Sequence, residues 1–221
     1  MAAAFILGVQ FKNLRQPGTI TVKGLAEKNF QSDSATWNTG VNAHGESYQE
    51  VLDLLTARRK KLSKFLGEQG FTAAEMKVGL PEVSRVFNET RDELGNVTRT
   101  PNGYDGDLNI VVNTKKLDKI QAAQRAILNF RFDNPQYLLG NLETIKRDLI
   151  TQATEDAQKR AAEFAKTGGG KVGAMRSASQ GSFNIYADTG SSEDDEYGGS
   201  YDKSTVGKQV RLVVTIEYGI E

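Results

Sequence analysis

Alternating apolar and polar residues predict a strand pair near the start of the chain. In residues 19–23, Ile20 and Val22 share one face, and residues 35–41 alternate in the same way around Trp37. Successive side chains of a strand point to opposite faces, so a period of two is typical of a strand with one buried side. We expect the two segments to pair through a connection at residues 28–34. Trp37, the only tryptophan, is expected to be buried.

Apolar residues spaced three and four positions apart predict three helices. The first begins after Gly45 and ends near Gly67, the second is short, and the third runs from about residue 142 to residue 166. Glycines at 168–170 end the third helix. Its alanines predict close packing against a neighbouring surface, because small side chains let a helix approach. The inward stripes comprise Tyr48, Val51, Leu52, Leu55, Leu62, Phe65 and Leu66; Leu117, Ile120, Ile127 and Leu128; and Leu142, Ile145, Leu149, Ala153, Ala157, Ala161 and Phe164.

Further strands are predicted at residues 76–80, 108–112 and 136–139. The polar, turn-rich residues 88–103 predict either a hairpin or a long loop between two strands. Two more strands, at residues 171–180 and 208–218, finish the chain. Residues 184–204 between them are rich in Gly, Ser, Asp and Glu, a composition typical of a mobile surface loop.

The order of these elements predicts the fold class. Strands and helices are interspersed without a regular βαβ repeat, which favours an α+β fold of two small lobes, with mostly antiparallel sheets packed against helices. We expect the first lobe at residues 18–87 and the second at residues 103–221, divided by the polar stretch 88–102. An open option is that the C-terminal strand, residues 208–218, pairs with the first lobe.

The N-terminal segment has two interpretations. Residues 2–9 form an apolar run far short of the ~20 residues that span a bilayer, and a polar, basic stretch follows them. Residues 1–17 are interpreted as the remnant of a membrane anchor or signal segment with its linker. The alternative is an ordinary N-terminal extension or a packed strand.

Composition excludes many kinds of active site. The chain has 28 basic and 28 acidic side chains, so no net field attracts a polyanion, and we expect no nucleic-acid partner. The absence of cysteine excludes disulfides, thiolate zinc sites, iron–sulfur clusters and cysteine nucleophiles. The single histidine, His44, excludes sites that need two imidazoles. No partner can be placed beside His44 from the sequence, so we expect it to be a turn residue.

Four kinds of short motif occur in the chain, and none of them is interpreted as a functional site. Residues 168–171 (Gly-Gly-Gly-Lys) lack the spacing of a phosphate loop and follow a helix instead of preceding one. Residues 58–61 (Arg-Arg-Lys-Lys) are interpreted as a solvated helix face, not as a nucleic-acid or lipid patch. The acidic run 191–196 lacks the alternating ligands of a calcium loop. The glycosylation acceptor pattern occurs at residues 88–90 and 96–98, which is about the number of matches expected by chance, so it indicates nothing about function.

Several segments together resemble the SIMPL domain family, over residues 18–218. The early ones are residues 19–27 (Thr-Ile-Thr-Val-Lys-Gly-Leu-Ala-Glu), residues 35–37 (Ala-Thr-Trp), the helix from Ser47, Gly70 with Phe71, and residues 75–78. The later ones are Gly103 with Tyr104 leading into residues 108–112, the alanines of residues 153–165, residues 170–173 (Gly-Lys-Val-Gly), and the closing strand 210–218. These motifs are structural glycines, alanines and alternations.

The resemblance implies a fold of two small α+β lobes and an extracytoplasmic location. Bacterial members are typically periplasmic or held by one N-terminal membrane helix, which here would precede the given residues. Some members assemble into large rings, and some are linked to envelope or oxidative stress defence. The resemblance carries over no catalytic residue.

Two classes of function follow. The first is a non-enzymatic periplasmic protein that acts by self-assembly or by binding an envelope protein. The second is a hydrolase or small-ligand-binding protein whose site uses only carboxylates and hydroxyls. We expect the first, with no catalytic, cofactor-binding or metal-binding residue and no cofactor, and with a homo-oligomer as the working form. The strand 208–218 and the helix 48–66 are the candidate subunit contacts, unless both are core.

Overall fold

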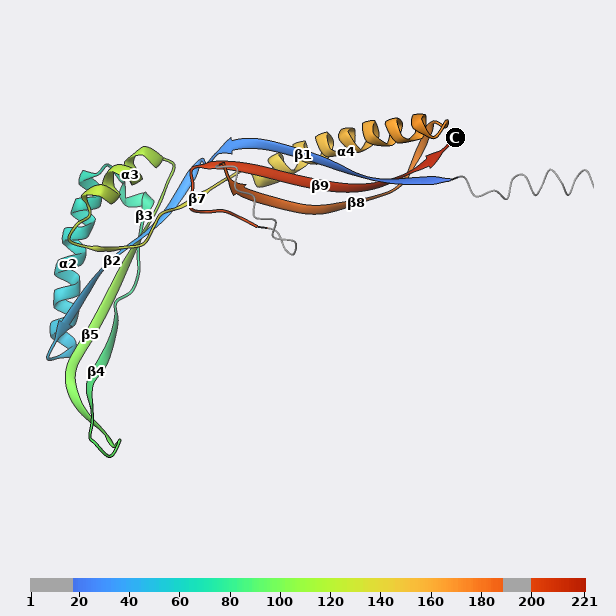
Figure 1. The fold of residues 1–221 in the computed structure, drawn as a ribbon. Helices are drawn as coiled ribbons and strands as arrows, with labels where there is room; N and C mark the ends of the chain where they lie inside the picture. Colours follow the sequence, from blue (N-terminus) through green and yellow to red (C-terminus); the bar gives the residue numbers. More distant parts are fainter. Residues whose placement is uncertain (1–17, 189–199) are drawn as a thin grey trace, which may run out of the picture. The chain divides into compact units, whose positions relative to one another are not determined.

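The computed structural model describes residues 18–188 and 200–221 (Figure 1). Its order is β1 (Thr19–Gln31), β2 (Ser34–Gly45), α2 (Tyr48–Glu68), the 3₁₀ turn η1 (Ala73–Glu75), β3 (Met76–Val78), β4 (Glu82–Arg91), β5 (Val97–Thr114), α3 (Leu117–Ala126), β6 (Arg131–Phe132), β7 (Gln136–Leu138), α4 (Leu142–Thr167), β8 (Val172–Ala187) and β9 (Gly207–Ile220). Helices pack on mostly antiparallel sheets, so the predicted α+β class is confirmed.

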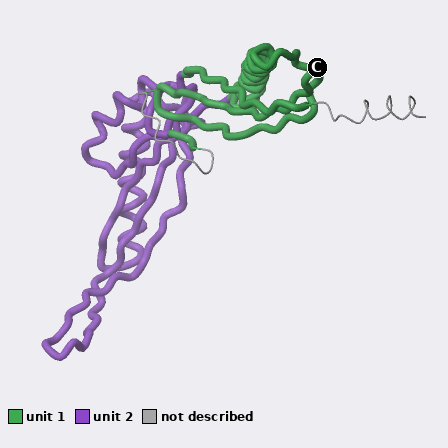
Figure 2. Tube along the Cα trace, turned by 45° about the vertical axis from the view of Figure 1, so that its right-hand side comes forward, with its two compact units in different colours: residues 1–30, 141–202, 207–221 green, residues 31–140, 203–206 purple. Residues whose placement is uncertain are grey.

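The chain forms two compact units (Figure 2). Unit 2 is a single insertion, residues 31–140, completed by residues 203–206. Unit 1 combines the described parts of residues 1–30, 141–202 and 207–221. Both ends of the described chain therefore belong to the same unit.

Unit 2 is a six-stranded sheet with helices on one face. Its strand order is β3-β5-β2-β6, with β4 also pairing with β5 and β7 with β2. The long strands β2 and β5 are antiparallel, with Trp37 opposite Val112, and their inward residues meet the apolar stripe of α2. Ser47 caps α2 by accepting a hydrogen bond from the Glu50 amide. Trp37 is fully buried, as predicted, and its indole N–H donates to the Asp133 carbonyl at 2.9 Å.

Unit 1 is a three-stranded sheet, β1-β9-β8, covered by α4. The alternate residues of β9 that the sequence placed on one face are buried, and so is the alanine stripe of α4. Close packing is confirmed at Gly24 on β1, where an added Cβ would lie 1.9 Å from the Ala153 carbonyl oxygen. Backbone and helix therefore meet where both sides carry small residues.

The predicted lobes and the first strand pair need correction. Residues 103–114 do not open a second lobe, because β5 pairs along β2 from Ala35 opposite Thr114 to Gly45 opposite Tyr104. β1 and β2 do not pair with each other, since β1 lies beside β9 in the other sheet. Alternation shows which face of a strand is buried, but it contains no information about the strand's partner. The C-terminal strand does pair with β1, a strand of the predicted first lobe.

Several side chains lie elsewhere than predicted. Phe164 is 63% exposed, and Ala165 takes its place in the stripe of α4. Tyr48, the first residue of α2, and Leu128, in the turn after α3, are exposed too. Both candidate subunit contacts are core elements: β9 is the central strand of its sheet, and the buried residues of α2 are inaccessible.

The predicted loop at residues 184–204 is shorter than expected. β8 continues to Ala187, and Asn184, Ile185 and Tyr186 are buried. Ile185 also exchanges backbone hydrogen bonds with residues 200 and 202, which follow the end of β8. The acidic run 191–196 and the N-terminal segment 1–17 lie outside the described residues. Among the described residues, no helix combines the length and apolar character that a membrane crossing requires.

Candidate functional site

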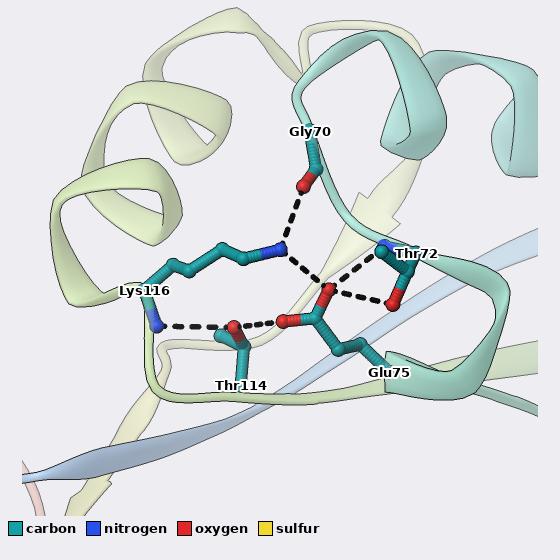
Figure 3. Close-up of polar contacts among 5 residues, drawn as sticks. All are labelled: Gly70, Thr72, Glu75, Thr114 and Lys116. Atoms are coloured by element: carbon teal, nitrogen blue, oxygen red, sulfur yellow. Dashed lines mark hydrogen bonds and ion pairs between the residues drawn. The ribbon is translucent and has the colours of Figure 1, made fainter.

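The densest polar cluster of unit 2 surrounds Glu75, the last residue of η1 (Figure 3). Three segments meet there: the turn after α2 with Gly70 and Thr72, the end of β5 at Thr114, and Lys116 just before α3. The hydrophobic core beneath these segments sets their positions, since Phe71 and Ile120 are both buried in it.

Every oxygen of the Glu75 carboxylate is hydrogen-bonded. Oε2 accepts from Lys116 Nζ at 2.8 Å and from the Thr72 backbone N and Oγ1 at 2.8 and 2.9 Å. Oε1 accepts from Thr114 Oγ1 at 2.6 Å. Lys116 Nζ also donates to the Gly70 carbonyl at 3.1 Å. Glu75, at the end of η1, and Lys116, just before α3, therefore form an ion pair between the segments that meet here.

These donors hold the pKa of Glu75 at about 2, below its ordinary value of 4.5. The Lys116 ammonium is the largest cause, followed by the Thr114 hydroxyl and the Thr72 amide, while partial burial opposes them. A general base works best when its pKa lies near the operating pH. Glu75 is therefore ionised, and its four hydrogen bonds clamp three segments together, while its low pKa makes it poorly suited to accept a proton.

Sequence reasoning did not find this cluster. Glu75 and Lys116 are 41 positions apart, and neither belongs to a chemical motif. The readable signal was local: Thr72 followed three residues later by Glu75 is a capping-box spacing, and the Glu75 side chain does reach back to the Thr72 amide. Glu75, Thr114 and Lys116 themselves line a pocket of about 520 Å³, which Thr36 and Lys115 also border.

His44 has a partner that the sequence could not place. The register of β2 and β5 sets His44 opposite Asp105, and Nδ1 lies 2.7 Å from Asp105 Oδ1. Both side chains are about half exposed. In the described part of the chain, no hydroxyl is hydrogen-bonded to the other ring nitrogen, so the pair lacks the nucleophile of a triad.

The remaining motifs have mostly structural roles. Residues 168–171 end α4, with Gly169 at φ +77°, so the helix stop is confirmed. In the basic run 58–61, Arg58, Lys60 and Lys61 are exposed, as predicted for a solvated helix face, and Arg58 also donates to the Asn42 carbonyl. Among residues 18–188 and 200–221, no group of three or more His, Asp or Glu side chains could hold a metal ion.

The outer half of the β4–β5 hairpin is a two-stranded ribbon, defined here as residues 87–101. Its turn is closed by Asp92, whose Oδ1 accepts from the Asn96 amide at 2.8 Å. β2 pairs with β5 only from Tyr104 onward, so within this ribbon neither strand has a second neighbour among the described residues. All of its residues are exposed.

The two faces of the ribbon differ in chemistry. On one face Phe87 lies opposite Pro101 and Arg91 opposite Val97, with the cross-strand pair Glu89–Arg99 between them at 2.6 Å. Phe87 and Val97 are 48% and 46% exposed. The other face carries the polar residues Asn88, Thr90, Thr98 and Thr100. A face on which three apolar residues are mixed with three charged ones, flanked by strand edges that no described strand covers, is suited to protein contacts.

Comparison with known proteins gives one informative match. A family model described as "SIMPL: Protein of unknown function (DUF541)" matches residues 20–218, nearly the whole chain. The matched span covers both units, including the glycine and alanine positions that bring β1 and α4 together. No curated protein matches the chain.

Proposed function

The chain belongs to the SIMPL family, and from this premise we propose that it acts without catalysis, by assembling with further copies of itself in the cell envelope. The observation that supports the proposal most strongly is the ribbon at residues 87–101. A two-stranded ribbon without further neighbours is marginally stable in water, so a strand or face supplied by another chain would stabilise it.

A second copy of the same chain is the occupant that the charges favour. The chain has equal numbers of acidic and basic residues, so identical copies do not repel each other at long range. The ribbon itself carries both signs, with three acidic and two basic residues: Glu89, Asp92 and Glu93, and Arg91 and Arg99. Two ribbons related by a two-fold axis can thus place their apolar ends together and pair opposite charges.

The polar clusters support a non-enzymatic role. Glu75 is held ionised by four hydrogen bonds, and His44 with Asp105 has no hydroxyl nucleophile among the described residues. A hydrolase that used only carboxylates and hydroxyls would need an acid or base with free lone pairs facing a cleft. Glu75 lines a pocket, and its Oε1 accepts a single hydrogen bond, but a pKa of about 2 makes this carboxylate a weak base.

The mass of the protein in solution tests self-assembly. We expect light scattering at micromolar concentration to give a multiple of 24.2 kDa for the wild type. The double variant Phe87→Ser/Val97→Ser should return the monomer mass. The matched control is Leu128→Ser, which removes an 86% exposed leucine of unit 2 outside the ribbon and should leave the multiple unchanged. A monomeric wild type, or a ribbon variant that still assembles, contradicts the proposal.

The envelope location and a role in stress defence rest on the family resemblance alone, and cell fractionation tests the first. The native protein should be released from intact cells by osmotic shock, or be extracted with the membrane fraction. A cell lacking it should be more sensitive to peroxide. Recovery only in the cytosolic fraction would exclude the envelope.

A further inference from the structure

A pocket of about 390 Å³ lies in unit 2 at the edge of β2, where α2 and the start of β6 border it. Three cationic side chains line it: Arg58 and Lys61 from α2, and Arg131 from β6. Neutral residues, among them Asn129 and Phe130, complete the wall, and none of the described lining residues is acidic. The tertiary fold thus gathers positive charge from distant parts of the chain into one concave site.

The edge of β2 explains why Arg58 is held there. β6 pairs only with Thr39 and Gly40, so beyond them this edge of β2 has no strand neighbour in the described part of the chain. Arg58 closes this edge by donating from Nη1 to the Asn42 carbonyl. Lys61, three positions later on α2, lies on the same helix face, and both side chains therefore reach the pocket.

The positive charge in the pocket is only partly compensated. Arg131 is paired with Asp107, which borders the adjoining pocket and not this one. The Nη2 atom of Arg131 also lies 3.5 Å from Asn109 Oδ1. Arg58 binds a neutral carbonyl, and Lys61 has no hydrogen bond or ion pair in the described part of the chain. The adjoining pocket also contains Asp105, which lies 2.7 Å from His44 Nδ1, so in the described part of the chain Asp107 is the one carboxylate paired with any of the three cations.

From this imbalance we propose that the pocket binds the phosphate group of an anionic ligand. Guanidinium groups present planar sets of donors that match phosphate oxygens, and an ammonium adds a third direction of approach. A phosphate dianion, with its several oxygens, satisfies three separate cations better than a carboxylate does. The site holds Arg58 and Arg131 in place by protein contacts before a ligand arrives, which lowers the entropy cost of binding.

The size and wall of the pocket extend the inference to the rest of the ligand. A volume of about 390 Å³ exceeds that of phosphate alone. Phe130 supplies an apolar surface and is itself fixed by Phe65, with ring centroids 5.8 Å apart. The phosphate group is thus carried on an organic body, either a soluble phosphate ester or a phospholipid headgroup.

Two neighbouring lysines of α2 provide a matched test. Both lysines are exposed, but only Lys61 lines the pocket, and Lys61→Gln and Lys60→Gln change the net charge equally. Titration with inorganic pyrophosphate at constant ionic strength should be saturable for the wild type. Lys61→Gln should weaken binding roughly tenfold, as expected for loss of a charged hydrogen bond. Lys60→Gln should stay within about twofold.

A second variant and a second probe complete the experiment. Arg131→Gln should also weaken pyrophosphate binding, and Trp37 emission confirms that each variant is folded. Sedimentation with phosphatidylglycerol vesicles, against phosphatidylcholine vesicles, separates the two sources. If the protein co-sediments with the vesicles, and if both pyrophosphate and Lys61→Gln reduce this binding, the ligand is a lipid headgroup. If the protein binds pyrophosphate but does not co-sediment, the ligand is a soluble phosphate ester. No saturable binding of either probe, or equal weakening by Lys60→Gln and Lys61→Gln, overturns the proposal.

Discussion

Lys116 Nζ lies 2.8 Å from Glu75 Oε2, although the two residues are 41 positions apart in the chain. This contact joins the end of η1 to the start of α3, over a core that contains Phe71 and Ile120. The ion pair is partly shielded, with side-chain exposures of 18% for Glu75 and 39% for Lys116. Its main consequence is for the stability of unit 2.

Replacing Glu75 by Gln should destabilise unit 2. The amide keeps the shape of the side chain but cannot accept from the ammonium and both threonines at once, so donors are left unsatisfied. We expect the free energy of unfolding at neutral pH to fall by about 1–3 kcal/mol. Denaturant unfolding followed by the emission of Trp37, the only tryptophan, measures this for unit 2 directly.

The matched control for that prediction is Glu68→Gln on α2. Glu68 pairs with Lys64 at 3.8 Å, and both side chains are largely exposed. Its loss should change the free energy of unfolding by no more than about 0.5 kcal/mol. Equal effects at the two positions would mean that the clamp at Glu75 contributes nothing beyond a surface ion pair.

Acid should destabilise unit 2 through the same carboxyl group. The pKa of Glu75 is about 2 in the folded protein, against 4.5 ordinarily, chiefly because of Lys116. Above pH 4.5 the group is charged in both states, and its contribution is fully present. Between pH 4.5 and 2 the unfolded chain binds a proton that the folded protein does not, so the free energy of unfolding decreases as the pH is lowered. Glu75→Gln should show a shallower decline of Trp37-monitored stability there, and parallel curves would contradict the assignment.

A methyl group at Gly24 should disrupt unit 1. The Cβ of Gly24→Ala would lie 1.9 Å from the Ala153 carbonyl oxygen and 2.7 Å from the Ala157 Cβ. Because the nearest atom is backbone, β1 and α4 must move apart, at a cost of about 3 kcal/mol or more. Thermal unfolding followed by circular dichroism measures the loss.

The control is Gly67→Ala, in the last turn of α2, where nothing lies within 4 Å of the new Cβ. This change should stabilise the helix by about 0.5–1 kcal/mol, since alanine loses less backbone entropy than glycine. If Gly24→Ala were tolerated equally well, the close approach of β1 to α4 would be wrong.

Lys208 should be essential for the stability of unit 1. Its side chain is fully buried, and Nζ donates to the Asp202 carbonyl and to Asp202 Oδ2, both at 2.7 Å. Lys208→Met keeps the aliphatic length but leaves a shielded carboxylate without its cation, so we expect a loss of about 2–3 kcal/mol. Lys23→Met, at an exposed position of β1, should change stability by at most about 0.5 kcal/mol. Thermal unfolding of both variants provides the comparison, and similar melting temperatures would refute the prediction.

Local sequence patterns were sufficient to predict most helices and strands and the face that each of them buries. The alternation around Trp37 predicted a strand with that residue inside, and the spacing of the alanines from Ala153 to Ala161 predicted a closely packed helix. These features recur every two or 3.6 residues, so a short window of sequence contains them. The composition also excluded some kinds of site: a chain without cysteine cannot form thiolate metal sites, and a chain with one histidine cannot form a site that needs two imidazoles.

Only the tertiary structure decided which elements are neighbours. β1 and β2 are nearly consecutive but lie in different sheets, and unit 1 is assembled from both ends of the chain. The same long-range pairing brought Glu75 to Lys116, and Arg131 to the pocket that Arg58 and Lys61 line. Strand partners are selected by the free energy of the whole packed core, and no periodicity within one segment records that choice.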